Sequence, residues 1–277
     1  MKMFALEASR VVPPSAQRVP RQAWRNGSTL IGERTLAEEV PIAFSYDGAT
    51  HAVLMATPDD LEDFALGFSY TEGIITAAAE IAELAVVSVA DGIVLRMWLM
   101  GDRSDAFAAR RRRFVGPAGC GMCGLESLAE ANRTIPMASY DLQVSRQDIA
   151  EAVAALPSRQ QLNIETRGVH AAAFWQPDQS LVLREDVGRH NALDKLAGAL
   201  LRTGRSAAAG VIVMSSRISI ELVQKAGMMG AAIIVGVSAP TALAVRTAEM
   251  AGLTLVGIAR DDGFEMFTHP ERIAPYW

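Results

Sequence analysis

The second half of the chain alternates short apolar runs with longer amphipathic segments, and this pattern restricts the fold more than any other feature. The runs are apolar throughout, which is typical of strands buried on both faces of a sheet. The segments between them have the apolar spacing of helices. Strands joined by helices predict an α/β domain with a mostly parallel sheet. We expect strands at 170–175, 180–184, 210–214, 231–237 and 253–259, and helices at 191–201, 218–229 and 241–251.

The first half has shorter periodic segments and predicts a smaller α+β part. Apolar and polar residues alternate over 35–46 as in a half-buried strand, and Asp91-Gly92 separates two apolar runs as in a hairpin. Thr57-Pro58-Asp59-Asp60 is a helix-start signal, because Thr caps, Pro suits the first turn and acids favour the positive helix end. The predicted organisation is an irregular arm at 1–30, an α+β part carrying the cysteines at 31–145, and an α/β domain with a nucleotide or cofactor site at 146–277.

The composition indicates a soluble globular protein. Half of the 277 residues are hydrophobic, and the formal net charge of -5 argues against a general nucleic-acid binder. No run approaches the roughly 20 apolar residues that cross a bilayer, and the N-terminus lacks the apolar core of a leader. Two cysteines provide no disulfide framework, so we expect a reducing compartment. The predicted location is the cytoplasm, with neither membrane nor nucleic acid as a partner.

Both cysteines lie in one short loop, Gly119-Cys120-Gly121-Met122-Cys123-Gly124. Glycine removes side-chain bulk, so this loop leaves a sulfur open to a large reactant. The loop follows an arginine run at 110–113 and precedes a helix expected at 125–131. Cations and a helix N-terminus favour the thiolate, which is the nucleophile. Such a pair serves as a disulfide, half of a metal site, a nucleophile with a helper, or two small residues in a turn.

A catalytic zinc site is poorly supported by the residues around the cysteine pair. Zinc takes about four ligands, and the pair supplies two. Nucleoside deaminases combine Pro-Cys-x-x-Cys with an upstream His-x-Glu. Here Pro117 lies three residues before Cys120, and the single upstream histidine, His51, is followed by Ala52 and Val53. We therefore predict no metal site and favour a nucleophilic sulfur.

Three strand-to-helix junctions in the second half predict an anion site. In open α/β sheets, ligands collect outside the carboxyl ends of strands, where helix N-termini offer free backbone N–H groups. Arg189 and Arg217 stand beside two of these junctions and favour a phosphate-bearing ligand. Ser, Thr and Asn at the same places also serve as ordinary caps. The junctions are Asp186-Val187-Gly188-Arg189-His190-Asn191, Ser215-Ser216-Arg217 and Ser238-Ala239-Pro240-Thr241.

Together these motifs resemble the FdhD/NarQ family of formate dehydrogenase accessory sulfurtransferases. The resemblance rests on Gly119 to Gly124, on the string Arg184-Glu185-Asp186-Val187-Gly188-Arg189-His190-Asn191-Ala192-Leu193-Asp194-Lys195, on Ala239-Pro240-Thr241 and on Leu253-Thr254-Leu255-Val256-Gly257. It runs from about Val40 to the C-terminus. It implies a cytidine-deaminase-like α/β core, a homodimer and no catalytic zinc.

The resemblance also implies a function. A persulfide forms on the first cysteine with sulfur from a cysteine desulfurase. The sulfur then passes to the molybdenum cofactor, in its bis-molybdopterin guanine dinucleotide form, before insertion into formate dehydrogenase. An alternative is a non-catalytic chaperone that binds this cofactor for a molybdoenzyme, with cysteines that only shape a loop.

Site residues follow from the family's motifs. Cys120 matches the persulfide cysteine, and Cys123 is its partner, which either relays or releases sulfur or is structural. GDP is the expected mimic of the cofactor, with Asp186 or Asp261 reading the guanine, or with Asp186 instead serving as a cap or bracing Arg189. The cofactor-binding candidates are Asp186, Gly188, Arg189, His190, Asn191, Ser216, Arg217, Pro240, Thr241, Ile258, Ala259, Arg260, Asp261, Asp262 and Gly263.

Overall fold

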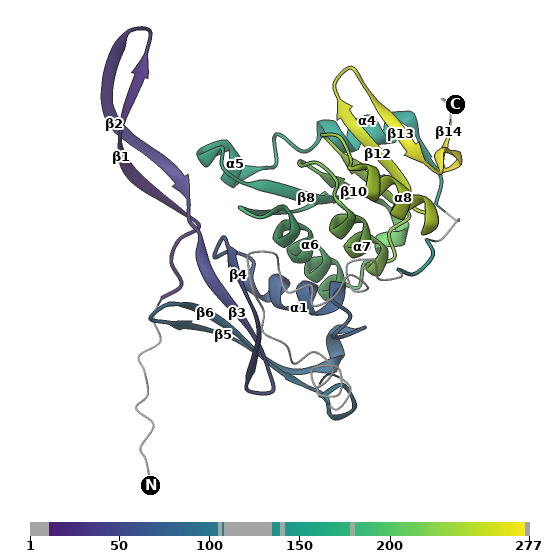
Figure 1. Cartoon of the computed structure of the whole chain (residues 1–277), viewed down its shortest axis with the longest axis horizontal. Coiled ribbons are helices and arrows are strands. Elements are labelled where there is room, and N and C mark those ends of the chain that lie inside the picture. Colours follow the sequence, from purple (N-terminus) through teal and green to yellow (C-terminus); the bar gives the residue numbers. More distant parts are fainter. Residues whose placement is uncertain (1–10, 105–106, 108–134, 139–141, 178–180, 275–277) are drawn as a thin grey trace.

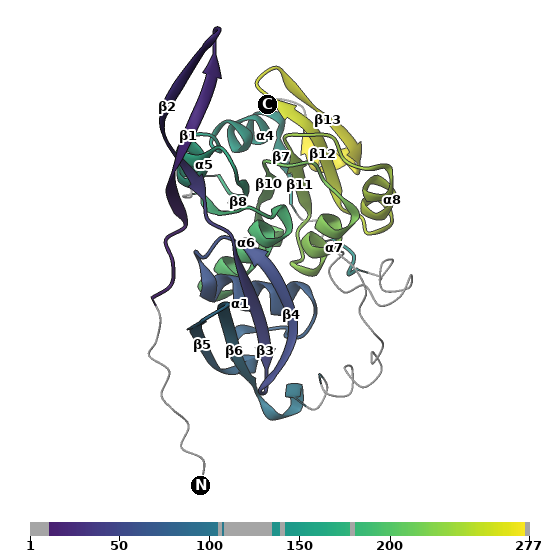
Figure 2. The same ribbon diagram turned by 60° about the vertical axis from the view of Figure 1, so that its left-hand side comes forward.

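Two β-sheets with helices packed between them make up the body of the protein, shown in Figures 1 and 2 as a computed structural model. The structure describes residues 11–104, 107, 135–138, 142–177 and 181–274. The loop with Cys120 and Cys123, the arginine run and the helix expected at 125–131 lie outside these residues. None of the described helices has both the length and the apolar character that a membrane span needs.

The first sheet and one helix enclose the core of the first half. The elements are β3 (Val40–Tyr46), β4 (Ala49–Ala56), α1 (Leu61–Thr71), β5 (Ile81–Val89) and β6 (Gly92–Leu99), with the strand order β4-β3-β6-β5. Apolar side chains from alternate strand positions, such as Phe44 and Leu95, are buried against Phe64 and Phe68 of α1. The hairpin predicted at Asp91-Gly92 is confirmed, because β5 and β6 pair antiparallel around it.

The N-terminal arm is a regular hairpin, and the prediction of an irregular segment over 1–30 is wrong for the described residues from Ala16 onward. Strands β1 (Ala16–Arg25) and β2 (Ser28–Ala37) pair in register along their full length. Asn26 and Gly27 between them both have positive φ, as a two-residue hairpin turn requires. Pro20 is compatible with this strand because β1 has an open edge. The hairpin projects from the body (Figure 1, purple).

The second sheet is mixed, which corrects the expectation of a mostly parallel sheet. Its order is β13-β12-β11-β10-β8-β9, and β10, β11 and β12 run parallel. The other pairings are antiparallel, because β9 and β13 each follow their neighbour through a connection too short for a helical crossover, and β8 enters from the opposite end. The strands are β8 (His170–Trp175), β9 (Val182–Asp186), β10 (Val211–Met214), β11 (Ile233–Gly236), β12 (Thr254–Arg260) and β13 (Gly263–Thr268).

Helices cover both faces of the second sheet. The predicted helices are confirmed as α6 (Arg189–Thr203), α7 (Ile220–Met228) and α8 (Ala242–Met250), which bury one face. The other face is covered by α4 (Arg146–Ala154), which begins after the N-cap Ser145 in a capping box. The short helix α5 (Gln161–Thr166) follows α4. Two-residue strands β7 (Val144–Ser145) and β14 (Ile273–Ala274) pair in parallel, so residues 144–145 join the second half of the chain.

Helices α1 and α6 join the two halves by crossing in backbone contact. A Cβ atom on Gly67 of α1 would overlap the carbonyl oxygen of Asp194, and a Cβ atom on Gly198 of α6 would overlap that of Asp63. The layers therefore follow one another as first sheet, α1, α6 with α7 and α8, second sheet, and α4 (Figures 1 and 2). The close crossing fixes the first half against the start of α6, where the predicted anion site lies.

Candidate functional site

The predicted junctions lie along one edge of the second sheet, where β9, β10 and β11 end. The N–H of Thr241 donates to the carbonyl of Ile218 over 2.9 Å, and the N–H of Ile258 donates to that of Ser238 over 3.2 Å. Ile218 and Pro240 also form an isolated parallel bridge. The loops after β10 and β11 and the strand β12 are thus held together by backbone hydrogen bonds. This is the arrangement that parallel strands predict for a ligand site.

Asp186 is buried at this edge and ties the start of α6 to the first half of the chain. Its carboxylate lies 2.7 Å from the Nζ atom of Lys195, and both side chains are fully buried. Its oxygens also accept hydrogen bonds from the N–H of Thr57 at 3.0 Å and from the N–H of Gly188 at 2.8 Å. Nδ2 of Asn191 donates to it at 2.9 Å. These contacts use both carboxylate oxygens, so Asp186 braces the loop, and its bond from Gly188, the N-cap residue of α6, agrees with the expected capping role.

The N-terminus of α6 has free donors for an anion. Its N-cap residue is Gly188, and no described side chain caps it. A Cβ atom on Gly188 would meet Nδ2 of Asn191, so the close turn needs glycine. Arg189 stands at the first helical position, and its Nε atom is buried without a hydrogen-bond partner among the described residues. An unsatisfied buried donor beside a helix N-terminus suits a phosphate oxygen.

Two histidines and a glutamate surround Arg189. Burial and the nearby Arg189 charge lower the pKa of His190 to about 4, so its imidazole is neutral at physiological pH. Burial and Arg189 also lower the pKa of His170. Burial opposes ionisation of Glu221, but hydrogen bonds from Ser219 and its own N–H, with His190 and Arg189 nearby, lower its pKa overall. The arginine charge is therefore the dominant cation of this cluster, and Glu221 is ionised beside it.

His170 and Glu221 belong to this cluster, although no sequence motif marks them as site residues. His170 begins β8, and only the antiparallel pairing of β8 with β10 brings the start of β8 to the edge where β10 ends. Glu221 lies in the first turn of α7, where an acid is also an ordinary helix-start residue. Its position 3.9 Å from Nε2 of His190 depends on how α6 and α7 pack.

The other two helix starts differ in their caps. Thr241 caps α8, because its hydroxyl accepts a hydrogen bond from the N–H of Ala244 at 3.2 Å, which is the ordinary capping role. Ser219 is the N-cap residue of α7, and its hydroxyl lies 3.4 Å from Nε2 of His190. Ser216 is buried and donates to the carbonyl of Arg217, whereas Arg217 is exposed. Arg217 is thus free to meet a ligand charge in front of α7.

The predicted cofactor-binding residues 258–263 form the end of β12 and the turn that leads into β13. Ala259 is buried, whereas residues 260–263 are exposed at the turn, with Arg260 paired to Gly263. Ile258 has a φ of 52°, which is strained for a β-branched residue and lies at a register shift of the strand pair. The structure joins Ile258 to the sheet edge through Ser238 and places Asp261 and Asp262 at the exposed turn.

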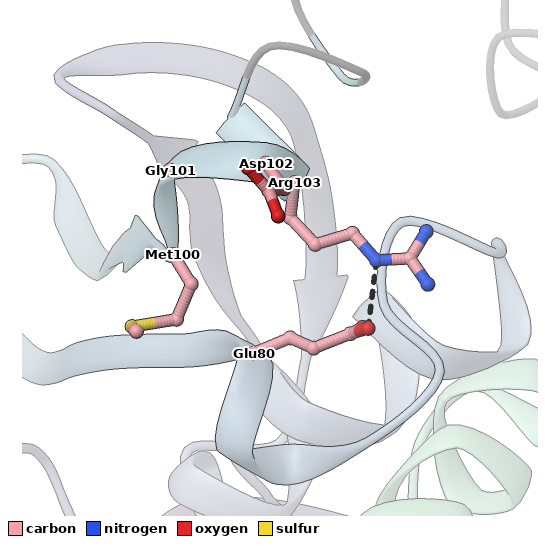
Figure 3. Close-up of a pocket in the computed structure, with 5 residues that line it drawn as sticks. All are labelled: Glu80, Met100, Gly101, Asp102 and Arg103. Atoms are coloured by element: carbon pink, nitrogen blue, oxygen red, sulfur yellow. Dashed lines mark ion pairs between the residues drawn. The ribbon is translucent and has the colours of Figure 1, made fainter.

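A surface hollow of about 520 Å³ lies where β6 ends (Figure 3). An ion pair of 2.8 Å between Arg103 and Glu80 crosses it. Its other lining residues are Met100, Gly101 and Asp102. Among the described residues, no group of three or more His, Cys, Asp or Glu could hold a metal ion. We assign no ligand to this hollow, and the chain continues from it towards the cysteine loop.

Comparisons with known proteins give one consistent result. Residues 37–274 match the model of the FdhD/NarQ family. A sulfur carrier protein FdhD from Agrobacterium fabrum is 50% identical over 264 residues, covering 95% of this chain and 97% of that protein. The protein of the same name from Cupriavidus necator is 42% identical, covering 94% and 91%. A crystal structure from Desulfotalea psychrophila, described as a formate dehydrogenase accessory protein, aligns with a TM-score of 0.73 and 26% identity, covering 94% of this chain and 100% of that one.

Proposed function

The chain belongs to the FdhD/NarQ family, and on this premise we propose that it is a sulfur carrier that serves a formate dehydrogenase. The observation that carries the proposal is the 50% identity to a named sulfur carrier along 95% of the chain. Sulfur would come from a cysteine desulfurase as a persulfide on Cys120. It would pass to the molybdenum cofactor in its bis-molybdopterin guanine dinucleotide form, before that cofactor enters the dehydrogenase. The activity is thus that of a cytoplasmic sulfurtransferase.

The loading step needs only sulfur chemistry. The Cys120 thiolate attacks the outer sulfur of the donor's persulfide, a new S–S bond forms, and the donor cysteine leaves as a thiolate. No net oxidation takes place. For release, the Cys123 thiolate attacks the inner sulfur of the Cys120 persulfide, so the outer sulfur leaves as sulfide and the two cysteines keep the oxidation as a disulfide. Both cysteines lie outside the described residues, and this assignment rests on their sequence motif.

The cofactor is the substrate, and the edge of the second sheet suits its phosphates. Arg189 has a buried donor without a partner, and the uncapped start of α6 adds free N–H groups. Arg217 supplies an exposed positive charge in front of α7. Asp261, exposed at the turn after β12, is the remaining candidate to pair with the guanine edge. The homodimer and the deaminase-like core that the resemblance implies are further parts of this proposal.

Sulfur loading is expected on the wild-type protein and not on Cys120→Ala. Incubation with a cysteine desulfurase and cysteine should add one sulfur atom, about 32 Da, which intact-mass measurement detects. Cys123→Ala is the matched control and should still load, because the first cysteine accepts the sulfur. An unchanged mass of the wild-type protein would favour the non-catalytic cofactor chaperone. Stoichiometric zinc in protein purified without chelator would contradict the sulfur assignment altogether.

GDP is expected to bind the wild-type protein, and Arg217→Ala should weaken this binding about 10- to 150-fold. The loss corresponds to roughly 1.5–3 kcal/mol for a charge-assisted hydrogen bond. Calorimetry measures it, and Arg159→Ala, at an exposed arginine after α4, is the control that should leave affinity unchanged. Sulfur loading should survive in Arg217→Ala, because the cysteines lie elsewhere in the sequence. Wild-type affinity in Arg217→Ala would remove this residue from the site.

A further inference from the structure

The starts of α6 and α7 bring an imidazole, a hydroxyl and a carboxylate together at the edge of the second sheet. His190 is the second residue of α6, Ser219 is the N-cap residue of α7, and Glu221 lies in the first turn of α7. Nε2 of His190 lies 3.4 Å from the hydroxyl oxygen of Ser219 and 3.9 Å from the carboxylate of Glu221. The hydroxyl donates to Glu221, so its oxygen is left to accept from the N–H of His190. These contacts hold the three side chains in place.

Glu221 keeps part of its carboxylate for a ligand. The side chain is 38% exposed. A carboxylate has about four acceptor sites, and the hydroxyl of Ser219 and the N–H of Glu221 itself use two of them. Among the described residues, the ion-pair partner within 4 Å is His190, and that imidazole is neutral at physiological pH. The remaining acceptor sites of Glu221 are therefore open to a donor on a bound molecule.

A carboxylate beside a phosphate site restricts what else the ligand carries. Glu221 is ionised and would repel a phosphate, so it has no use in a site for phosphate alone. A carboxylate only accepts hydrogen bonds, so it needs N–H or O–H groups on the ligand. Among the common bases, guanine alone presents two adjacent N–H donors, N1–H and N2–H, which match the two oxygens of a carboxylate. Adenine and cytosine have a ring nitrogen that accepts next to their amino group, and this nitrogen would face the carboxylate unfavourably.

The ring of His190 offers a surface for the flat face of a base. Its side chain is 33% exposed, and its imidazole is uncharged because burial and the charge of Arg189 lower its pKa to about 4. Bases stack on aromatic side chains whatever their identity. Hydrogen bonds to the Watson–Crick edge then select one base. Glu221 lies beside this ring, within reach of the edge of a base stacked on it.

We propose that Glu221 reads the guanine of the bound nucleotide, and that the base stacks on His190. The inference rests on the proposed function, which assigns the phosphates of the cofactor to this edge, and it adds the residue that selects the base. Glu221 takes this role in place of Asp261. The carboxylate of Asp261 is exposed at the turn after β12, where water competes for its oxygens.

Calorimetry of the full chain with GDP, IDP and ADP tests the assignment. IDP lacks the N2 amino group of guanine, and ADP has no pair of adjacent donors. The wild-type protein is expected to bind GDP most tightly, IDP less tightly and ADP least. Glu221→Ala should lower the affinity for GDP about 10- to 150-fold, because charge-assisted hydrogen bonds are lost, and should not lower the affinity for ADP. The preference for guanine should then disappear.

Two kinds of variant check the roles of the carboxylate and of the ring. Glu151→Ala removes an exposed glutamate from α4, on the opposite face of the second sheet, and should leave all three affinities unchanged. His190→Ala should weaken GDP and ADP by a similar factor, about 5- to 150-fold for one stacked base. His190→Phe keeps a flat ring and should restore most of this affinity.

The outcomes separate this inference from the proposed function. Sulfur loading should survive in Glu221→Ala, together with the wild-type circular dichroism. A wild-type protein that binds GDP and ADP equally, or a guanine preference that persists in Glu221→Ala, would overturn the inference and leave the sulfur carrier standing. A preference that is lost in Asp261→Ala instead would give the guanine to that residue. A wild-type protein that loads sulfur but binds none of the nucleotides would remove the cofactor edge, and the role of Glu221 with it.

Discussion

A Gly198→Ala variant is expected to lose at least ~3 kcal/mol of unfolding free energy, and with it much of its folded population. The added methyl group would overlap the carbonyl oxygen of Asp63, an atom of the α1 backbone. Backbone cannot turn aside as a side chain does, so the two helices must separate. Separation would also break the contact between Asp63 and the arginines Arg184 and Arg202, at 2.6 and 2.8 Å.

Urea denaturation followed by circular dichroism measures this loss. Gly67→Ala, on the facing helix, should be as severe, because its methyl group would overlap the carbonyl oxygen of Asp194. Gly101→Ala is the matched control, since a Cβ there meets no described heavy atom within 4 Å. A midpoint for Gly198→Ala equal to that of Gly101→Ala would show that the helices do not cross in backbone contact.

The fold of the second half was largely predictable because its helices and central strands have strong periodicity. The runs at 210–214, 231–237 and 253–259 correspond to the parallel strands β10, β11 and β12. The direction of β8 was not predictable in this way, since an apolar run does not show which way its strand points. The arm carried a readable signal in Asn26-Gly27, but proline and arginine around it suggested irregular structure.

The site was predictable where it depends on strand ends and not where it depends on packing. The junctions around Arg189, Arg217 and Thr241 follow from strand order, and the structure brings them to one edge. The burial of Asp186 was not predictable, because it results from Lys195 in α6 and from Thr57 in the other half of the chain. The prediction that Thr57 caps the following helix is wrong, because α1 begins at Leu61 after the N-cap residue Asp60 and has no side-chain cap. The hydroxyl of Thr57 instead accepts from the N–H of Val187 at 3.2 Å, across the two halves of the chain.

The contact between the halves therefore holds the proposed cofactor edge. Nδ2 of Asn191 donates to the carbonyl of Met55 at the end of β4, over 2.9 Å, and Lys195 donates to the carbonyl of Thr57 at the same distance. Residues at the end of the first sheet therefore position the start of α6 as much as the second sheet does. A change in the first half thus reaches the helix N-terminus that we assign to a phosphate.

A second large loss of stability is expected from Lys225→Met, which leaves the buried carboxylate of Asp194 without its positively charged partner. Lys225 lies 2.9 Å from Asp194 and 2.8 Å from Glu72, and its side chain is 8% exposed. Burial alone would lower the pKa of Lys225, but these carboxylates hold it above its ordinary value. Removing one member of a buried pair costs about 3–5 kcal/mol. We expect a loss of this size at pH 7 from urea denaturation.

The loss in Lys225→Met should shrink as the pH falls from 7 to 5. Burial already raises the pKa of Asp194, and removal of the lysine charge raises it further. A carboxyl whose pKa is higher in the folded than in the unfolded state takes up its proton first in the folded state. Stability of the variant therefore increases as the pH falls towards the ordinary carboxyl value of about 4. Arg103→Met, which breaks the more exposed pair with Glu80, is the control and should cost less than ~1 kcal/mol. A loss in Lys225→Met that stays constant or grows at pH 5 would mean that Asp194 is not the group left unpaired.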